Sequence, residues 1–154
     1  MASRVTSTID IAAPAEAIWA LLCDANRYPE YAVPAERMLS VPDEPMREGY
    51  VYREFGGLPP FKSESEWRVA AFEPYRHQVH AGDDGKMAIH LEFLLEPAGV
   101  ATRVTSTLTL TPRAYLAPVN ALLWPLMMRK RGQSAMDGTL ANIKRIVETE
   151  QAAH

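Results

Sequence analysis

Residues 86–110, KMAIHLEFLLEPAGVATRVTSTLTL, contain two alternating segments on either side of a turn with Pro and Gly. Apolar side chains recur at every second position, as in strands with one face in a core and one in water. The turn is too short for a crossover, so the two strands pair antiparallel as a hairpin. The positions expected on the apolar face are Met87, Ile89, Leu91, Phe93 and Leu95, followed by Val100, Val104, Leu108 and Leu110.

The same signals continue upstream of this hairpin. Short segments such as REGY, GGLPP, EPY and GDDGK each contain Gly or Pro and mark turns between strands. Turns of this length indicate hairpins, so the pattern predicts an antiparallel meander of about seven strands. The strands are expected at residues 4–11, 36–42, 49–56, 61–73, 75–82, 86–96 and 100–112.

Two helical patterns accompany the strands. In AAPAEAIWALLCD, residues 12–24, Ile18, Leu21 and Leu22 have the spacing of an amphipathic helix. From about residue 126 to 150, Met136, Leu140, Ile143 and Val147 form a single apolar stripe. A sheet with one wet face needs its apolar face covered, and the second helix is long enough to cover it.

These patterns together predict an α+β fold. We expect a single domain over residues 1–154, with a curved antiparallel sheet of about seven strands around a long C-terminal helix. A chain of 154 residues buries enough surface for one core of this kind.

Composition narrows the classes of function. The formal net charge of −3 argues against a dedicated nucleic-acid binder, which would carry a basic excess. Cys23 is the single cysteine, so no disulfide can form within the chain, which fits a reducing, cytoplasmic location. The N-terminus MASRVTSTID lacks the apolar core of a signal peptide. We therefore expect a cytoplasmic globular protein.

The segment at residues 115–131 contains LLWPLMMRKR and is apolar up to three consecutive cations. It is shorter than the ~20 apolar residues of a membrane span and is interrupted by Pro118, Asn120 and Pro125. Three interpretations stay open: a lid over a pocket, a transient contact with an anionic membrane surface, or an interface in an oligomer. A packed helix with solvated cations is the simpler alternative.

Five motifs in this order resemble one superfamily. They are STIDIAAPAEAIWALLCDANRYPEY at 7–31, EGYVYR at 48–53, WRVAAFEPYR at 67–76, LEPAGVATRVT at 95–105 and LANIKRIVE at 140–148. Together they resemble the START-like (SRPBCC) superfamily, which includes polyketide cyclases/dehydrases and lipid transport proteins. One departure is Ala101, where many members have Gly. The resemblance implies a helix-grip fold around an apolar cavity, with no catalytic set shared by all members and no cofactor.

Three polar residues are candidates for contact with a ligand inside such a cavity. Arg53 alternates with Val51 and Phe55, and if it points inward it needs an anionic or oxygen partner. In the opposite register Tyr50, Tyr52 and Glu54 point inward and Arg53 lies in water. The sequence does not choose between these registers.

His77 and Ser65 are the other two polar candidates. His77 is the strongest single candidate for proton transfer if it points inward, whereas a hydrogen-bonded structural histidine is the simpler interpretation. Ser65 shares a strand face with Ser63 and Trp67 and leaves room for a ligand. His80 and His90 are expected together on the wet face, without a third ligand for a metal, so we expect no metal site.

The leading hypothesis is that the protein binds or carries a small hydrophobic molecule, such as a lipid, a polyketide-like aromatic or a quinone. The first alternative is a polyketide cyclase/dehydrase-type enzyme without metal or covalent nucleophile, in which His77 or Arg53 handles protons. The second alternative is a protein-interaction module with a vestigial cavity. The expected ligand-binding residues are Arg53, Phe55, Ser65, Trp67, His77, Leu91, Phe93, Leu108, Trp124, Met128, Met136 and Leu140.

Overall fold

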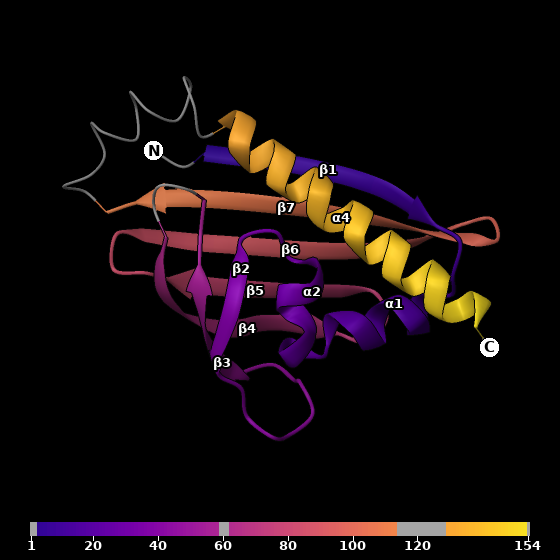
Figure 1. Ribbon diagram of the computed structural model, residues 1–154, viewed down its shortest axis with the longest axis horizontal. Coiled ribbons are helices and arrows are strands. Elements are labelled where there is room, and N and C mark those ends of the chain that lie inside the picture. Colours follow the sequence, from indigo (N-terminus) through magenta and orange to yellow (C-terminus); the bar gives the residue numbers. More distant parts are fainter. Residues whose placement is uncertain (1–2, 59–61, 114–128, 154) are drawn as a thin grey trace.

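Seven strands form one antiparallel sheet in the computed structural model, which describes residues 3–58, 62–113 and 129–153. The strand order is β1-β7-β6-β5-β4-β3-β2, so β1 closes the sheet beside the last strand and the others follow as a meander (Figure 1). The strands are β1 (Ser3–Ile11), β2 (Ala35–Ser40), β3 (Val51–Gly56), β4 (Ser63–Glu73), β5 (His77–Asp83), β6 (Met87–Ala98) and β7 (Ala101–Pro112). The prediction of an antiparallel α+β fold is confirmed.

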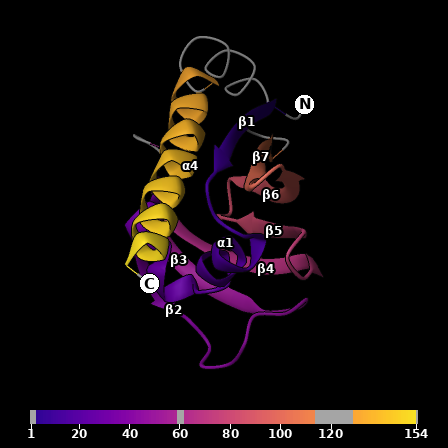
Figure 2. The same ribbon diagram turned by 90° about the vertical axis from the view of Figure 1, so that its right-hand side faces the viewer.

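Helices cover the concave side of this sheet. They are α1 (Ala15–Leu22), the 3-10 turn η1 (Ala25–Arg27), α2 (Tyr28–Tyr31) and the long α4 (Arg129–Ala152). Figure 2 shows the sheet curving, with α4 across its open side. The curvature has a local cause in β4, where the register with β5 shifts between Val69 and Ala71, because a bulge of this kind bends and twists a strand.

The predicted stripe on α4 is the face that packs into the core. Met136, Leu140, Ile143 and Val147 are all buried, and Ile18, Leu21 and Leu22 of α1 belong to the same interior. On the sheet, Val104, Leu108 and Leu110 are buried as expected. Val100 is the exception, because it lies in the turn after Gly99 and is fully exposed.

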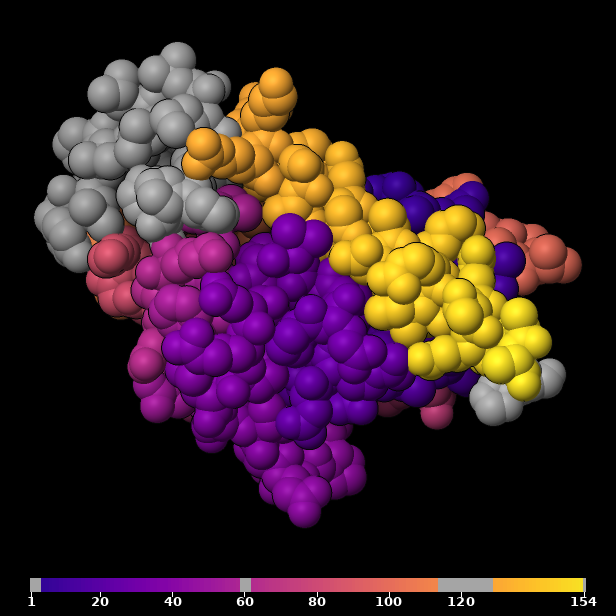
Figure 3. All heavy atoms as spheres, viewed as in Figure 1, coloured from indigo at the N-terminus to yellow at the C-terminus, as the bar shows by residue number. Residues whose placement is uncertain are grey.

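Hydrogen bonds hold α4 along both of its sides. Toward β1, Ser7 Oγ donates to Asp137 Oδ1 at 2.5 Å, and Lys144 Nζ donates to the Asp10 carbonyl at 3.0 Å. Toward the chain after α2, Thr139 Oγ1 accepts from the Val33 N–H at 3.0 Å. Figure 3 shows the atoms of α4 directly against this N-terminal part of the chain. The helix therefore bridges the curved sheet.

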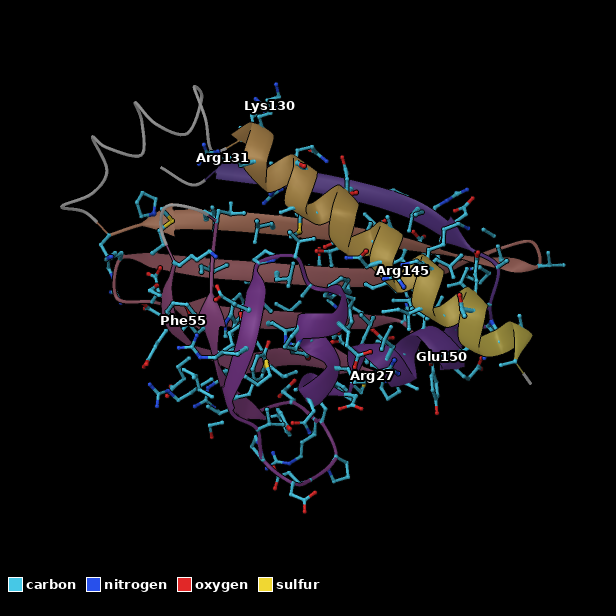
Figure 4. All side chains as sticks on the ribbon, in the orientation of Figure 1. Arg27, Phe55, Lys130, Arg131, Arg145 and Glu150 are labelled. Carbon is cyan, nitrogen blue, oxygen red and sulfur yellow. The ribbon has the colours of Figure 1, made fainter. Side chains whose placement is uncertain are left out.

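An ion pair between Arg27 and Glu150 connects the C-terminal end of α4 to η1. Arg27 Nη2, on η1, lies 2.7 Å from Glu150 Oε2 and 3.0 Å from Glu30 Oε1. Figure 4 shows the Arg27 and Glu150 side chains reaching toward one another from the two elements. Both carboxylates are half exposed, so this contact positions the helix end more than it stabilises the fold.

Candidate ligand-binding cavity

A cavity of about 370 Å³ lies between the concave face of the sheet and the helices α2 and α4. Its wall is mainly apolar, with polar groups from α2, β3, β4, β5, the β5–β6 turn and α4. The apolar lining includes Leu22, Ala35, Leu58, Trp67, Met87, Ile89, Leu91, Phe93, Leu108, Leu110, Pro112 and Met136. The polar lining includes Tyr28, Tyr31, Tyr52, Glu54, Ser65, His80, Asp84, Lys86 and Thr139.

A row of paired residues across the sheet contributes to the cavity wall. Tyr52 pairs with Trp67, Trp67 with Gly82, Gly82 with Ile89, and Ile89 with Leu110. Gly82 is required here, because a Cβ at this position would lie 2.6 Å from the Trp67 ring. The indole therefore lies flat on the β5 backbone and forms one wall of the cavity.

Tyr52 and His80 of the cavity wall belong to a hydrogen-bonded polar group, here called the polar floor. The Tyr52 hydroxyl lies 2.8 Å from His80 Nδ1, and His80 Nε2 lies 2.6 Å from Gln78 Oε1. Because Gln78 Oε1 only accepts, His80 carries its proton on Nε2 and accepts from Tyr52 at Nδ1. Gln78 Nε2 in turn donates to Cys23 Sγ at 3.9 Å.

Burial keeps the groups of this floor neutral. It lowers the pKa of His80 to about 4, because the imidazolium form would lose its hydration. Burial also raises the pKa of Tyr52 well above its ordinary value and that of the Cys23 thiol to about 11. A thiol with this pKa is a poor nucleophile at neutral pH, so Cys23 does not suit covalent catalysis.

Glu54 is an ionisable group in the wall of the cavity, which His80, Asp84 and Lys86 also line. It follows Tyr52 by two positions on β3, so it faces the same side of the sheet, and it pairs with Ser65 on β4. Burial raises the pKa of its carboxyl to about 7, and the Trp67 indole N–H offsets a part of that rise. Near neutral pH this carboxyl therefore exchanges a proton readily.

Trp67 Nε1 is buried and has no hydrogen-bond partner within the described part of the chain. It approaches the Glu54 carboxyl closely enough to act on its pKa, but not in the geometry of a hydrogen bond. A buried donor without a partner costs about 1–3 kcal/mol.

Six of the twelve residues expected to bind a ligand line the cavity. They come from three strands of the sheet, β4, β6 and β7, and from α4. Trp124 and Met128 fall outside the described residues, as does most of the segment 115–131. The six are Ser65, Trp67, Leu91, Phe93, Leu108 and Met136.

Arg53 and Phe55 lie on the outer face of β3, which corrects the register that placed them inside. Arg53 Nη2 forms an exposed ion pair with Glu64 Oε2 at 3.1 Å. The Phe55 ring lies under the Arg37 guanidinium, 4.3 Å from ring centroid to Cζ. The alternative register, with Tyr50, Tyr52 and Glu54 inward, is the one that the sheet adopts.

His77 is also on the outer face, where its Nε2 lies 2.6 Å from Glu92 Oε2. The interior side chains of β5 are Gln78 and His80 instead, so the expectation that His80 and His90 share the wet face is wrong. Leu140 is buried in the core but does not line the cavity. Sequence reasoning thus missed Gln78 and His80 as interior polar groups, and no local pattern marks them.

No helix in the described part of the chain is long and apolar enough to cross a bilayer. The described residues likewise contain no group of three or more His, Cys, Asp or Glu side chains placed to hold a metal ion.

Solved structures with this architecture come from several organisms. A protein of Thermus thermophilus is 21% identical, with a TM-score of 0.73 over 96% of this chain and 99% of that one. A START superfamily protein of Mycobacterium smegmatis is 15% identical, with a TM-score of 0.72 over 95% and 97%. The ZhuI aromatase/cyclase of Streptomyces sp. R1128 is 18% identical, with a TM-score of 0.70 over 100% and 97%. At these identities the likeness concerns the fold.

No curated protein sequence matches the chain. The family described as polyketide cyclase / dehydrase and lipid transport, in contrast, matches residues 2–148, which is nearly the whole chain. The chain therefore belongs to this family, and its seven-stranded sheet with α4 across it has the architecture of the solved structures above.

Proposed function

We propose that the protein binds a small, largely apolar molecule in the cavity between the sheet and α4. The observation that carries the proposal is the cavity itself, about 370 Å³ with mainly apolar walls. This volume lies in the range of ligand sites, about 300–1,000 Å³. Lipids, polyketide-like aromatics and quinones have the matching chemistry.

The energetic cost of an empty cavity supports the same proposal. At about 24 cal/mol per Å³, a closed dry void of this volume would cost roughly 9 kcal/mol, an upper bound here because the cavity is partly open and has polar groups in its wall that water can hydrate. That is comparable to the whole stability of a typical domain, about 5–15 kcal/mol. A bound ligand would remove the part of this cost that the apolar walls carry and raise the free energy of unfolding.

The first experiment compares native and denaturing mass spectra of protein purified without detergent. We expect a defined small mass that is present in the native spectrum and released on denaturation. Binding of the dye anilinonaphthalene sulfonate, displaced by an apolar competitor, provides a second measurement for protein that has lost its ligand. An apo native mass together with no dye binding would contradict the proposal.

A cyclase-type enzyme is the second candidate function, and one observation favours it. Glu54 places a carboxyl with a pKa of about 7 in the cavity wall, which suits proton transfer at neutral pH. Arg53 and His77 lie outside the cavity and do not take this role. An enzyme would lose turnover in Glu54→Gln while still binding its ligand, whereas a carrier has no turnover to lose.

A further inference from the structure

Most polar groups in the cavity wall already have a partner within the protein. Tyr52 bonds to His80, and the Tyr28 hydroxyl donates to the Leu22 carbonyl at 3.1 Å. The Tyr31 hydroxyl donates to the Leu21 carbonyl at 3.5 Å. These groups shape the cavity, but their donors are engaged and contribute little to the recognition of a polar atom on a ligand.

Glu54 and Trp67 differ from these groups. Trp67 is 7% exposed, and its indole N–H has no hydrogen-bond partner among the described residues. Among the same residues no cation forms an ion pair with Glu54, so no charge holds its carboxyl in the ionised form. The two side chains lie next to each other in the same wall, where Glu54 has no ion-pair partner and the buried indole N–H of Trp67 has no hydrogen-bond partner among the described residues.

A protonated carboxyl has one O–H donor and one carbonyl oxygen that accepts. The indole N–H only donates, so its one suitable partner on Glu54 is an oxygen. If that oxygen accepts from Trp67, the carboxyl O–H is left to donate to a group in the cavity. A carbonyl oxygen on a ligand is the acceptor that completes this arrangement.

We propose that Glu54 is the polar anchor of the cavity: in the ligand-bound state its carboxyl donates a hydrogen bond to a ligand carbonyl oxygen, and the neighbouring Trp67 indole N–H closes to donate to the second carboxyl oxygen. The ligand class is then an apolar molecule that carries a ketone or a similar carbonyl group. Glu54 touches the ligand, and Trp67 is a positioning residue that acts through Glu54. This inference rests on the proposed function, because it assumes that the cavity takes a ligand.

The test uses two aromatic probes of matched shape, fluorenone and fluorene, which differ in one carbonyl oxygen. Affinities for the full chain are measured by equilibrium dialysis at about pH 6, below the Glu54 pKa of about 7. Glu54→Met removes the donor and keeps the length of the side chain. Glu54→Gln keeps one donor and one acceptor.

We expect Glu54→Met to weaken fluorenone binding roughly fivefold and to leave fluorene binding unchanged within about twofold, as for the loss of one neutral hydrogen bond. Glu54→Gln should restore most of the fluorenone affinity. Glu64→Met is the matched control, because Glu64 lies on the outer face in its ion pair with Arg53, and it should change neither affinity.

Trp67→Phe tests the positioning role with a readout whose direction separates the N–H from packing, because loosened packing would hydrate Glu54 and lower its pKa. Loss of the indole N–H should raise the pKa of Glu54, measured by carbon NMR titration of its carboxyl, because that N–H favours the ionised form. Trp19→Phe is the control, since Trp19 is buried against Phe72 and does not line the cavity.

Three outcomes would overturn the inference. One is an equal loss of fluorenone and fluorene affinity in Glu54→Met, which would indicate packing only. Another is undiminished fluorenone binding in the same variant. The third is an unchanged Glu54 pKa in Trp67→Phe. In these cases the proposed function stands as long as the wild type binds fluorene. If the wild type binds neither probe, this inference fails, whereas the proposed function fails only if the native mass is apo and no dye binds.

Discussion

Tyr52, Arg53 and Glu54 show how adjacent residues on one strand meet opposite environments. Tyr52 and Glu54 point into the cavity, whereas Arg53 reaches an exposed ion pair with Glu64. A register with Arg53 inward would bury its guanidinium without a partner, which is costly. In the observed register the Tyr52 hydroxyl donates to His80 Nδ1. Such polar contacts therefore help to decide which face of β3 points into the cavity.

At the residue scale, Tyr52→Phe should lower the free energy of unfolding by about 1–3 kcal/mol, because it leaves His80 Nδ1 buried without a donor. The measurement is urea unfolding at neutral pH. Tyr75→Phe is the control, since Tyr75 is 53% exposed, and its effect should stay within about 0.5 kcal/mol. Equal effects of the two substitutions would show that the Tyr52–His80 bond adds nothing to stability.

Glu54 should make stability depend on pH in a direction opposite to most carboxylates. Its pKa is about 7 in the folded protein against an ordinary value of 4.5, so the unfolded chain ionises first as pH rises. Stability is therefore lost as pH rises from about 4.5 through 7, by about 3 kcal/mol once the carboxyl is ionised in both states.

The substitution Glu54→Gln isolates this effect, because the ionisation of His80 and of the other groups is common to both proteins. Between pH 4.5 and pH 8 we expect the variant to gain about 3 kcal/mol of stability relative to the wild type. Urea unfolding at both pH values measures it. A difference that does not vary with pH would show that the Glu54 carboxyl ionises normally in the fold.

At the scale of elements, α4 is held by its apolar stripe and by polar contacts on both sides. Thr139 is 3% exposed, and its Oγ1 accepts from the Val33 N–H at 3.0 Å. This contact joins α4 to the segment between α2 and β2, on the side of the helix away from β1. It is one of the contacts that keep the cavity between the helices and the sheet.

Thr139→Val keeps the shape of the side chain and removes the acceptor. We expect the free energy of unfolding to fall by about 1–2 kcal/mol, because the Val33 N–H loses its partner. Thr149→Val, at an exposed position of the same helix, controls for helix propensity and should have an effect below about 0.5 kcal/mol. Chemical denaturation measures the free energy of unfolding of both variants. Equal losses in the two would contradict a stabilising role for the Thr139–Val33 contact.

At the scale of the molecule, the cavity of about 370 Å³ leaves space for a ligand and lowers the stability of the ligand-free fold. Leu108 lines this cavity, whereas Leu140 is packed in the core and does not line it. The two positions carry the same residue type and are both buried, at 6% and 1% exposure. They therefore form a matched pair for enlarging a side chain.

Leu108→Phe should fill empty space, raise stability by about 0.5–2 kcal/mol and reduce ligand binding. Leu140→Phe should overpack the core and lower stability by about 1–3 kcal/mol. Thermal unfolding and anilinonaphthalene sulfonate binding measure the two effects. A destabilising Leu108→Phe would mean that the cavity has collapsed in solution.

The sequence alone determined the strands, the long helix and their antiparallel order, because the alternation and the α4 stripe are local patterns that follow directly from burial on one face. It also predicted the contributions of Ser65, Trp67, Leu91, Phe93, Leu108 and Met136 to the cavity wall, which lie on clearly amphipathic elements.

Only the tertiary structure decided which faces of β3 and β5 point inward. Both faces of YVYREF combine aromatic or aliphatic residues with a charge, so its alternation fits either register. Pairing with β4, whose inner face carries Ser65 and Trp67, places Tyr52 and Glu54 inside. On β5, Gln78 and His80 point inward and are buried, next to the point where the register with β4 shifts after Val69. Strand pairing is a long-range interaction, and hydrogen bonds formed across the sheet are what make these buried polar side chains stable.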